Sequence, residues 1–561
     1  MLIDAEALDE RSPLATEVCI VGSGPAGMAI AAELCRAGIR IVLLEQGGRA
    51  QLGGNASRWI IRTADGNRNS VRLTPFHEED FVPRSEICDA GWPVGPQELQ
   101  PWYRRAKQLF GLPPCGFEAA AWEEPGARRL PLPEQRLVSN VFQFGDGRVF
   151  HKVLREEVAA SPFATVLCNA TACEIVTIPG GARARGVRLV DRAGRSIEVG
   201  AEHVVLAAGG AASAHLLLLS DTGRRAAIGN GHGLVGRYLM DHPLLDGGDF
   251  VPDSRRLIDA MALYDLRHLH GQSIMGHLRI APEALLGERL PQLSALFFPR
   301  PADHRERLVL QPRQERARRA VLEMISRRPR DAARDLRCVA AMVWGADALI
   351  DMAWRDVRGR YPRLSRGGWS GLDRAAEAFG AFQVVHQAEQ PPRWDNRYQL
   401  ASEVDAQGRR KLEKHWVWHA EDVARTMRSQ DLYAAEIAAS GLGRYAVLRE
   451  QGRPSILASS TLHIMGTTRM HDDPKKGVVD ARCRVHEVSN IFVAGSSTFV
   501  TGSFANPTLT IVALALRVAE DLKDTLRRVV HVRPDAAPAP PAARLAAASA
   551  ASMHAAGLPS V

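Results

Sequence analysis

The chain has 561 residues, of which 46% are hydrophobic and 24% charged, a composition that excludes a disordered protein. Its net charge of +8 comes from 71 Lys and Arg against 63 Asp and Glu, with both signs mixed along the chain, so we expect no nucleic-acid partner. No signal-like segment, no long apolar run and no zinc-like spacing of the eight cysteines occurs. We therefore expect a cytoplasmic protein with no integral membrane segment and no metal site.

The first predicted element is a strand–helix–strand unit. Residues 18–21 form a short apolar run, residues 25–37 a helical pattern, and residues 41–44 a second apolar run. The turn after the first run has the spacing G-x-G-x-x-G, which lets a tight turn bring backbone amides and a helix N-terminus to a pyrophosphate. An acidic residue closes the second strand, where a carboxylate can accept hydrogen bonds from a ribose. The residues expected at this dinucleotide site are Gly22, Gly24, Pro25, Ala26, Gly27, Glu45 and Gln46. Their spacing alone leaves NAD and FAD both open.

In the rest of the chain, stretches with a clear secondary-structure pattern alternate with stretches whose pattern is mixed. Residues 49–114 are rich in loops, residues 164–199 indicate antiparallel strands, and residues 203–210 indicate a buried strand ending in glycines. Residues 257–440 mix helical and strand patterns, and residues 490–497 indicate a strand and turn. A strongly periodic helix is predicted over residues 507–526, and an Ala/Pro-rich tail follows.

Several separate peptides resemble those of the glucose–methanol–choline (GMC) oxidoreductases. At the C-terminus they are LHIMGTTRM, GVVD, NIFVAGSS and NPTLTIVALALR, in that order. Nearer the N-terminus they are the glycine turn, GGNASRW, HVVLAAGG and VGRYLMDHP. The His–Asn pair described next and the peptide TACEI are most similar to the pyranose oxidase-like branch.

This resemblance implies a cofactor and a fold. The cofactor is FAD, and the fold is α/β, with a discontinuous Rossmann-like FAD-binding domain and a second, β-rich α+β substrate-binding domain. Further FAD contacts are implied at Gly53, Gly54, Asn55, Ser57, Cys173, Ala208, Gly495, Ser496, Asn506, Pro507 and Thr508. The histidine that can link covalently to the flavin in pyranose oxidases is replaced here by Arg58, so we expect FAD to be bound non-covalently.

The resemblance also places a catalytic His at His463 and its partner at Asn506. A neutral imidazole can take the hydroxyl proton while hydride leaves the alcohol carbon, and an amide can orient that hydroxyl. Asn506 also suits a helix N-cap. We favour structural roles for His242 and His486, and ordinary packing over sugar stacking for the tryptophans of the middle segment.

The expected function is FAD-dependent oxidation of an alcohol group of a sugar, glycoside, amino sugar or related polyol. Oxygen or another compound would accept the electrons. An FAD-containing lyase on the same fold, and an FAD-dependent dehydrogenase of a non-sugar alcohol, are the alternatives. We expect the FAD-binding domain at residues 1–75, 161–250 and 456–530, a loop-rich FAD-lid and substrate segment at 76–160, and the substrate-binding domain at 251–455. Residues 531–561 are expected to be a disordered tail.

Overall fold

The computed structural model describes residues 1–8, 14–59, 61–63, 66–88, 90–220, 226–300, 367–372 and 379–532. The chain forms two compact units, Met1–Ala519 and Glu520–Val561, and the second contains the C-terminal part of helix α15 (Thr508–Val532). Of the tail predicted at 531–561, residues 531 and 532 belong to α15, and the rest lies outside the described residues. Within the described ranges, no helix is long and apolar enough to cross a bilayer.

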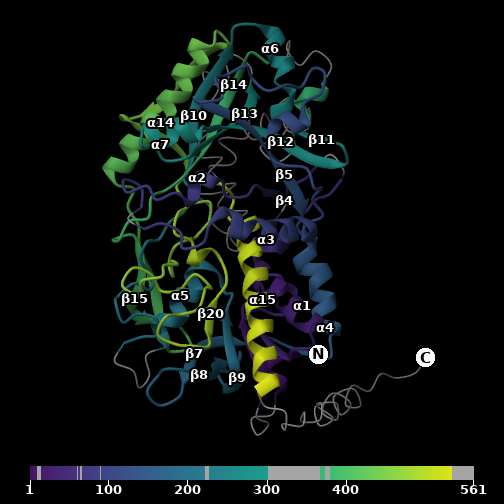
Figure 1. Ribbon diagram of the computed structural model, residues 1–561, viewed down its shortest axis with the longest axis vertical. Helices are drawn as coiled ribbons and strands as arrows, with labels where there is room; N and C mark the ends of the chain where they lie inside the picture. Colours follow the sequence, from purple (N-terminus) through teal and green to yellow (C-terminus); the bar gives the residue numbers. More distant parts are fainter. Residues whose placement is uncertain are drawn as a thin grey trace, which may run out of the picture. The chain divides into compact units, whose positions relative to one another are not determined.

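The first sheet carries the strand–helix–strand unit (Figure 1). Its path runs β1-β6-β3-β2-β9-β8-β7, and β20 pairs with β9. The pairs β1-β6, β6-β3, β3-β2, β2-β9 and β9-β20 are parallel, whereas the pairs β9-β8 and β8-β7 are antiparallel. Its strands are β1 (Leu2–Asp4), β2 (Leu14–Val21), β3 (Ile41–Leu44), β6 (Ala164–Cys168), β7 (Thr171–Thr177), β8 (Ala184–Val190), β9 (Ser196–Leu206) and β20 (Ile491–Val493).

Helices α1 (Pro25–Arg36) and α5 (Gly209–Leu219) each begin shortly after a parallel strand of this sheet. Helix α1 packs against β2, β3 and helix α4 (Leu154–Ala160), and its small residues, such as Ala29 and Ala32, allow that close approach. Because β2, β3, β9 and β20 are parallel, their carboxyl ends lie at one edge of the sheet. Ligands of open α/β sheets bind in the crevice at such an edge.

The second sheet is antiparallel in every pair that is described (Figure 1). Its path is β18-β19-β10-β14-β13-β12-β5-β4, with β17 on β10 and β11 on β12. Its strands are β4 (Ser70–Leu73), β5 (Leu137–Asp146), β10 (Leu244–Pro252), β11 (Leu266–Leu269), β12 (Gln272–Ile280), β13 (Leu293–Arg300), β14 (Ala381–Ala388), β17 (Gly443–Val447), β18 (Arg449–Glu450) and β19 (Arg453–Ala458).

Helix α14 (Ala420–Ala439) packs on β13, β17 and β19 and helps to close a large apolar core over this sheet. Trp369 and Trp418 are buried in that core, whereas Trp394 is exposed beneath the guanidinium of Arg237. Packing therefore accounts for the two buried rings, as the sequence favoured. The remaining elements are α2 (Glu78–Phe81), α3 (Pro96–Leu109), α6 (Arg255–Ala260), α7 (Pro282–Gly287) and the hairpin of β15 (Arg397–Val404) and β16 (Arg410–His415).

The predicted fold class is confirmed, because a mostly parallel α/β sheet is joined to a second, β-rich region with helices. The predicted domain limits stay a proposal. The first sheet takes its strands from residues 2–44, 164–206 and 491–493, in line with a discontinuous domain. Strand β4 and all but the last two residues of β10, however, fall inside the ranges proposed for that domain, and both strands pair in the second sheet.

Candidate active site

The glycine turn between β2 and α1 has the shape that its spacing predicts. Gly22 has φ +102°, and a Cβ there would lie 2.7 Å from the carbonyl oxygen of Ala207. A Cβ on Gly27 would lie 1.9 Å from the carbonyl oxygen of Gly22, so helix and strand touch at this point. A Cβ on Gly24 would meet only the Ala207 oxygen, at 4.0 Å. Gly24 therefore borders open space at the N-terminus of α1, where Pro25 and Ala26 form the first turn.

Glu45 follows β3 directly and faces this turn. Its carboxylate accepts hydrogen bonds from the backbone N–H of Gly47 (2.8 Å) and from the hydroxyl of Ser23. The backbone N–H of Ala170 donates to the carbonyl of Glu45, so the turn after β6 lies beside it. Gln46 is exposed. The carboxylate is thus fixed by the chain and keeps acceptor capacity for a hydroxyl donor.

The GGNASRW loop packs on the same turn. A Cβ on Gly54, which has φ +58°, would lie 2.9 Å from the Cα of Gly24, and the Gly53 N–H donates to Ser23 Oγ at 3.3 Å. Gly53 itself packs against the backbone of His151. The structure thus brings the two predicted glycine segments together. Asn55, Ser57 and Arg58 are exposed, and Ser57 Oγ donates to the carbonyl of Gly54.

The other expected cofactor residues lie at or near the same sheet edge. Ala208 follows β9, and Gly495 and Ser496 follow β20, each at the carboxyl end of a parallel strand. Ser496 Oγ donates to the carbonyl of Ile464, which links this edge to the segment of His463. Cys173 lies on β7, where burial raises the pKa of its thiol and Sγ donates to the carbonyl of Thr171.

His463 and Asn506 meet although 43 residues separate them in the sequence. His463 lies in the loop between β19 and β20, and Asn506 precedes helix α15. Asn506 Nδ2 lies 3.5 Å from His463 Nε2, and both residues keep accessible surface. An alcohol oxygen between them could give its proton to the imidazole and accept a hydrogen bond from the amide.

His242 fixes the tautomer of His463 through a chain of hydrogen bonds. His242 Nε2 lies 3.1 Å from the carbonyl oxygen of Gly502, which can only accept, so Nε2 carries the proton. His242 Nδ1 is then an acceptor, and it lies 2.9 Å from His463 Nδ1. Thr461 Oγ1 lies 2.9 Å from the same nitrogen and donates its own proton to the carbonyl of His242, so both neighbours can accept from His463 Nδ1. The lone pair of His463 is thereby left on Nε2, on the side of Asn506. The structural role favoured for His242 stays a prediction, and the structure adds a direct contact between its ring and the candidate base.

Arg72 and Gln387 hold the amide of Asn506. Arg72 Nε and Nη2 donate to Asn506 Oδ1 at 3.0 and 2.8 Å, so its Nδ2 turns toward His463. Arg72 Nη2 also donates to Gln387 Oε1, and Gln387 Nε2 donates to the carbonyl of Phe504. Helix α15 begins two residues later, at Thr508, and the amide oxygen of Asn506 is engaged by Arg72. The predicted N-cap role is therefore not what this side chain performs.

Burial controls protonation in this cluster. It drives the pKa of His463 well below the usual 6.5, and electrostatic interaction with His242 and Arg72 lowers that pKa further. Burial also lowers the pKa of His242, and it lowers the pKa of Arg72 to about 10. At neutral pH the imidazole is therefore a neutral base beside a guanidinium cation.

The start of helix α15 adds a second set of donors. The first bond of its ladder runs from the N–H of Ile511 to the carbonyl of Pro507, so the amides of residues 508–510 precede it. Leu509 and Thr510 are fully buried. Amides in that position carry the positive end of the helix dipole and suit a negatively charged or electron-rich ligand group.

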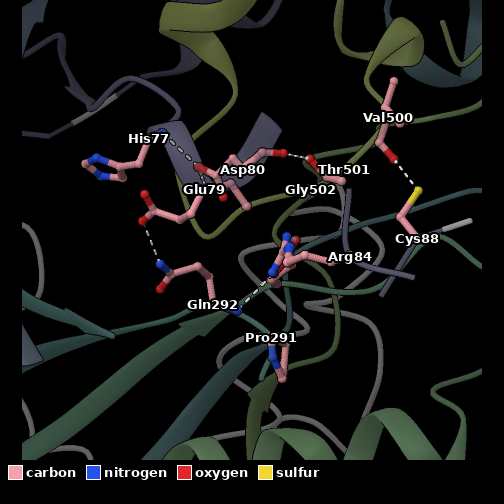
Figure 2. Close-up of polar contacts among 12 residues, drawn as sticks. His77, Glu79, Asp80, Arg84, Cys88, Pro291, Gln292, Val500, Thr501 and Gly502 are labelled. Carbon is pink, nitrogen blue, oxygen red and sulfur yellow. Dashed lines mark hydrogen bonds and ion pairs between the residues drawn. The ribbon is translucent and has the colours of Figure 1, made fainter. Parts of the chain in front are cut away.

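An acid cluster contacts the segment 500–506 through Asp80, which bonds to Thr501 and Ser503. Figure 2 shows Glu79, Asp80 and Arg84 of this cluster, and Glu389 and Arg279 complete it. Arg84 makes two bonds to Glu389, at 3.0 and 2.6 Å, and Arg279 pairs with Glu79. Asp80 Oδ2 accepts from the His77 N–H and from Ser503 Oγ, both at 2.8 Å. Burial, with the negative charges of Glu79 and Glu389, raises the pKa of Asp80 to about 7.

Sequence reasoning missed Arg72, Gln387 and the acid cluster. Arg72 and Gln387 are single polar residues on β4 and β14, and nothing in their neighbourhoods distinguishes them from surface positions. The run of acids at residues 78–80 was a visible signal beside an apolar phenylalanine. His486 Nε2 lies 2.7 Å from the carbonyl oxygen of His471, a contact in line with the structural role expected for this residue.

Comparisons with known proteins agree with this architecture. Family models described as GMC oxidoreductase match residues 149–244 and 392–515, and a model of the NAD(P)-binding Rossmann-like domain matches residues 20–79. Paromamine 6'-oxidase of Streptomyces fradiae is 24% identical, over 92% of this chain and 93% of the relative. A 2-methyl-1,2-propanediol dehydrogenase of Mycolicibacterium austroafricanum is 22% identical, over 92% and 97%. A pyranose 2-oxidase of Lyophyllum shimeji is 39% identical, over 12% and 11%.

The described residues fit the FAD that the family binds. Gly24 borders open space at a helix N-terminus, where a pyrophosphate can approach the backbone. Glu45 presents a carboxylate at the end of β3, and the buried amides at the start of α15 lack acceptors within the described chain. The chain belongs to the GMC oxidoreductase family, near its pyranose oxidase branch, and is an FAD-dependent alcohol oxidoreductase.

Proposed function

We propose that the chain oxidises an alcohol group of a sugar, glycoside, amino sugar or related polyol, with His463 as the general base. The observation that carries this proposal is the pair of His463 Nε2 and Asn506 Nδ2, 3.5 Å apart and both accessible. The sugar class is supported by relatives named as oxidases of paromamine and pyranose, while a propanediol dehydrogenase keeps a simpler alcohol as the second candidate.

The chain's residues divide the chemistry among them. Bound FAD supplies the hydride acceptor. His463 Nε2 takes the hydroxyl proton, and its lowered pKa keeps it unprotonated for that step. Asn506 Nδ2 donates to the same oxygen and stabilises the negative charge that develops there. His242 accepts from His463 Nδ1 and so favours the imidazolium form once the proton has moved.

The cofactor contacts are part of the proposal. The pyrophosphate would lie on the turn of Gly22, Gly24 and Gly27, with Pro25 and Ala26 behind it and the ribose on Glu45 and Gln46. The flavin would be contacted by the GGNASRW loop and by the start of α15, and the adenine end would lie near Cys173. We propose non-covalent binding, because no histidine precedes Trp59.

Two glycine variants test the pyrophosphate site. Gly24 has an extended backbone, with φ −63° and ψ −178°, and space for a side chain, so Gly24→Val should fold and lose FAD. Gly27→Val is the contrast, because its Cβ would meet a carbonyl oxygen at 1.9 Å and should disturb folding itself. Flavin content and circular dichroism separate the two effects. Full flavin occupancy in a folded Gly24→Val protein would contradict the site.

Anaerobic reduction tests the reaction. The purified flavoprotein is mixed without oxygen with sugars, amino sugars, glycosides and simple diols, and the loss of flavin absorbance is followed. Bleaching by a sugar or polyol is the expected result. Bleaching by simple diols alone would replace the sugar class with the second candidate, and a flavin that no alcohol reduces would contradict the proposal.

A further inference from the structure

Arg72 is an interior cation whose described contacts are all neutral. Its guanidinium donates to Asn506 Oδ1 and Gln387 Oε1, and its Cζ lies 4.5 Å from the centre of the Phe142 ring. Across the described ranges, no carboxylate lies within ion-pair distance of it. Arg84 and Arg279 show the contrast, since each is buried and each contacts a glutamate. An interior charge without a counter-ion is costly and is usually kept for a function.

The guanidinium has donors left for a ligand. Nε and Nη2 are engaged by the two amides, whereas Nη1 has no partner in the described part of the chain. Arg72 keeps accessible surface, as do His463 and Asn506, while Gln387 and His242 beside them are buried. The guanidinium therefore lies directly beside Asn506, one of the two residues proposed to contact the substrate hydroxyl.

Asp241, the acid that bonds to the backbone of His242 and His463, does not neutralise Arg72. Asp241 is 1% exposed, and its Oδ1 accepts from the backbone N–H groups of His242 and His463. Its Oδ2 accepts from the hydroxyl of Ser460. Its charge is thus directed at the backbone and a hydroxyl, and no ion pair joins it to Arg72 in the described part of the chain.

We propose that Arg72 selects substrates by charge, so that a carboxylate near the reacting hydroxyl favours binding, a neutral polyol is accepted, and an ammonium group there is rejected. This inference rests on the proposed oxidation of a sugar or polyol. It narrows the substrate class, because it excludes amino sugars whose ammonium group is next to the reacting carbon. Guanidinium groups bind carboxylates with directed, charge-assisted hydrogen bonds. A like charge about 5 Å away in a protein interior lowers affinity by about a hundredfold.

Binding of acetate tests the cation without any turnover. Acetate is titrated calorimetrically into the flavin-loaded protein, its Arg72→Gln and Arg72→Lys variants, and Arg185→Gln, which alters an exposed arginine on β8. We expect binding to the unaltered protein and to Arg185→Gln, a loss of about tenfold or more in Arg72→Gln, and an intermediate loss in Arg72→Lys. No acetate binding to the unaltered protein, or equal binding to Arg72→Gln, would overturn the proposal.

A matched set of sugars tests the selection itself. Glucuronate, glucose and 6-amino-6-deoxyglucose differ in the charge of the C6 substituent on one scaffold, and the measured quantity is the ratio of their kcat/KM values. We expect glucuronate to exceed the 6-amino sugar by about a hundredfold, and Arg72→Gln to bring the two within a few fold. An unchanged ratio, with all three rates lowered alike, would mean that Arg72 only positions Asn506, and it would refute charge selection. If none of the sugars reduces the flavin, the sugar class fails, and the acetate titration still decides the role of Arg72.

Discussion

Two buried polar clusters border the segment 500–506, and they respond to burial in opposite ways. In the active-site cluster, burial keeps the imidazoles of His242 and His463 neutral beside the cation of Arg72. In the acid cluster, three carboxyl groups face two guanidinium groups, and burial raises the pKa of Asp80 to about 7. Desolvation thus leaves His463 as a neutral proton acceptor in the active-site cluster, whereas in the acid cluster it keeps Asp80 protonated up to about pH 7. The kinds of side chain in a cluster, rather than how deeply the cluster is buried, decide whether burial leaves a neutral base or a protonated acid.

The largest expected effect follows from removing the proton acceptor. His463→Ala should retain FAD and slow flavin reduction by about a hundredfold or more, the usual contribution of a general base. Stopped-flow reduction under anaerobic conditions measures this directly. His486→Gln is the matched control, because that ring contacts the carbonyl of His471 and lies in no described contact with the cluster. Reduction at the normal rate in His463→Ala would remove it from the mechanism.

A smaller effect is expected at His242, where two replacements separate hydrogen bonding from packing. His242→Leu removes the acceptor for His463 Nδ1, and we expect flavin reduction to slow by about tenfold to a hundredfold, as for other groups that orient a functional histidine. His242→Asn can place an amide oxygen near the former Nδ1 and should recover most of the rate. Equal losses in the two variants would show that His242 only fills space.

Much of the fold could be predicted from the sequence, because the patterns that indicate it lie within short stretches of the chain. The glycine turn, Glu45 and the apolar strands lie within 30 residues, and family-like peptides identify His463 and Asn506. Arg72 and Gln387 could not be predicted, because they meet only once β4 and β14 take their places in the same sheet, and more than 300 residues separate them in the sequence. For His242 the motif was visible, but only the 2.9 Å contact between two Nδ1 atoms distinguishes a partner of the base from a core histidine.

The smallest expected effect lies in the acid cluster and concerns stability. The folded pKa of Asp80, about 7, exceeds its ordinary value of 3.8, so the folded state binds this proton more tightly than the unfolded state. The resulting stabilisation is complete below pH 3.8 and is lost as pH rises toward 7. Relative to Asp80→Asn, which cannot ionise, the unaltered protein should therefore lose about 3 kcal/mol of stability between pH 5 and pH 8.

Urea unfolding of the flavin-loaded proteins at pH 5 and pH 8 measures this difference. Asp405→Asn, in the turn between β15 and β16, is the control, because the pKa of Asp405 is lowered and its carboxylate is ionised at both pH values. If the unaltered protein and Asp80→Asn respond to pH in parallel, Asp80 does not hold the proton. The negative excess of the acid cluster would then have to be neutralised elsewhere, and the contrast between the two clusters would rest on Arg72 alone.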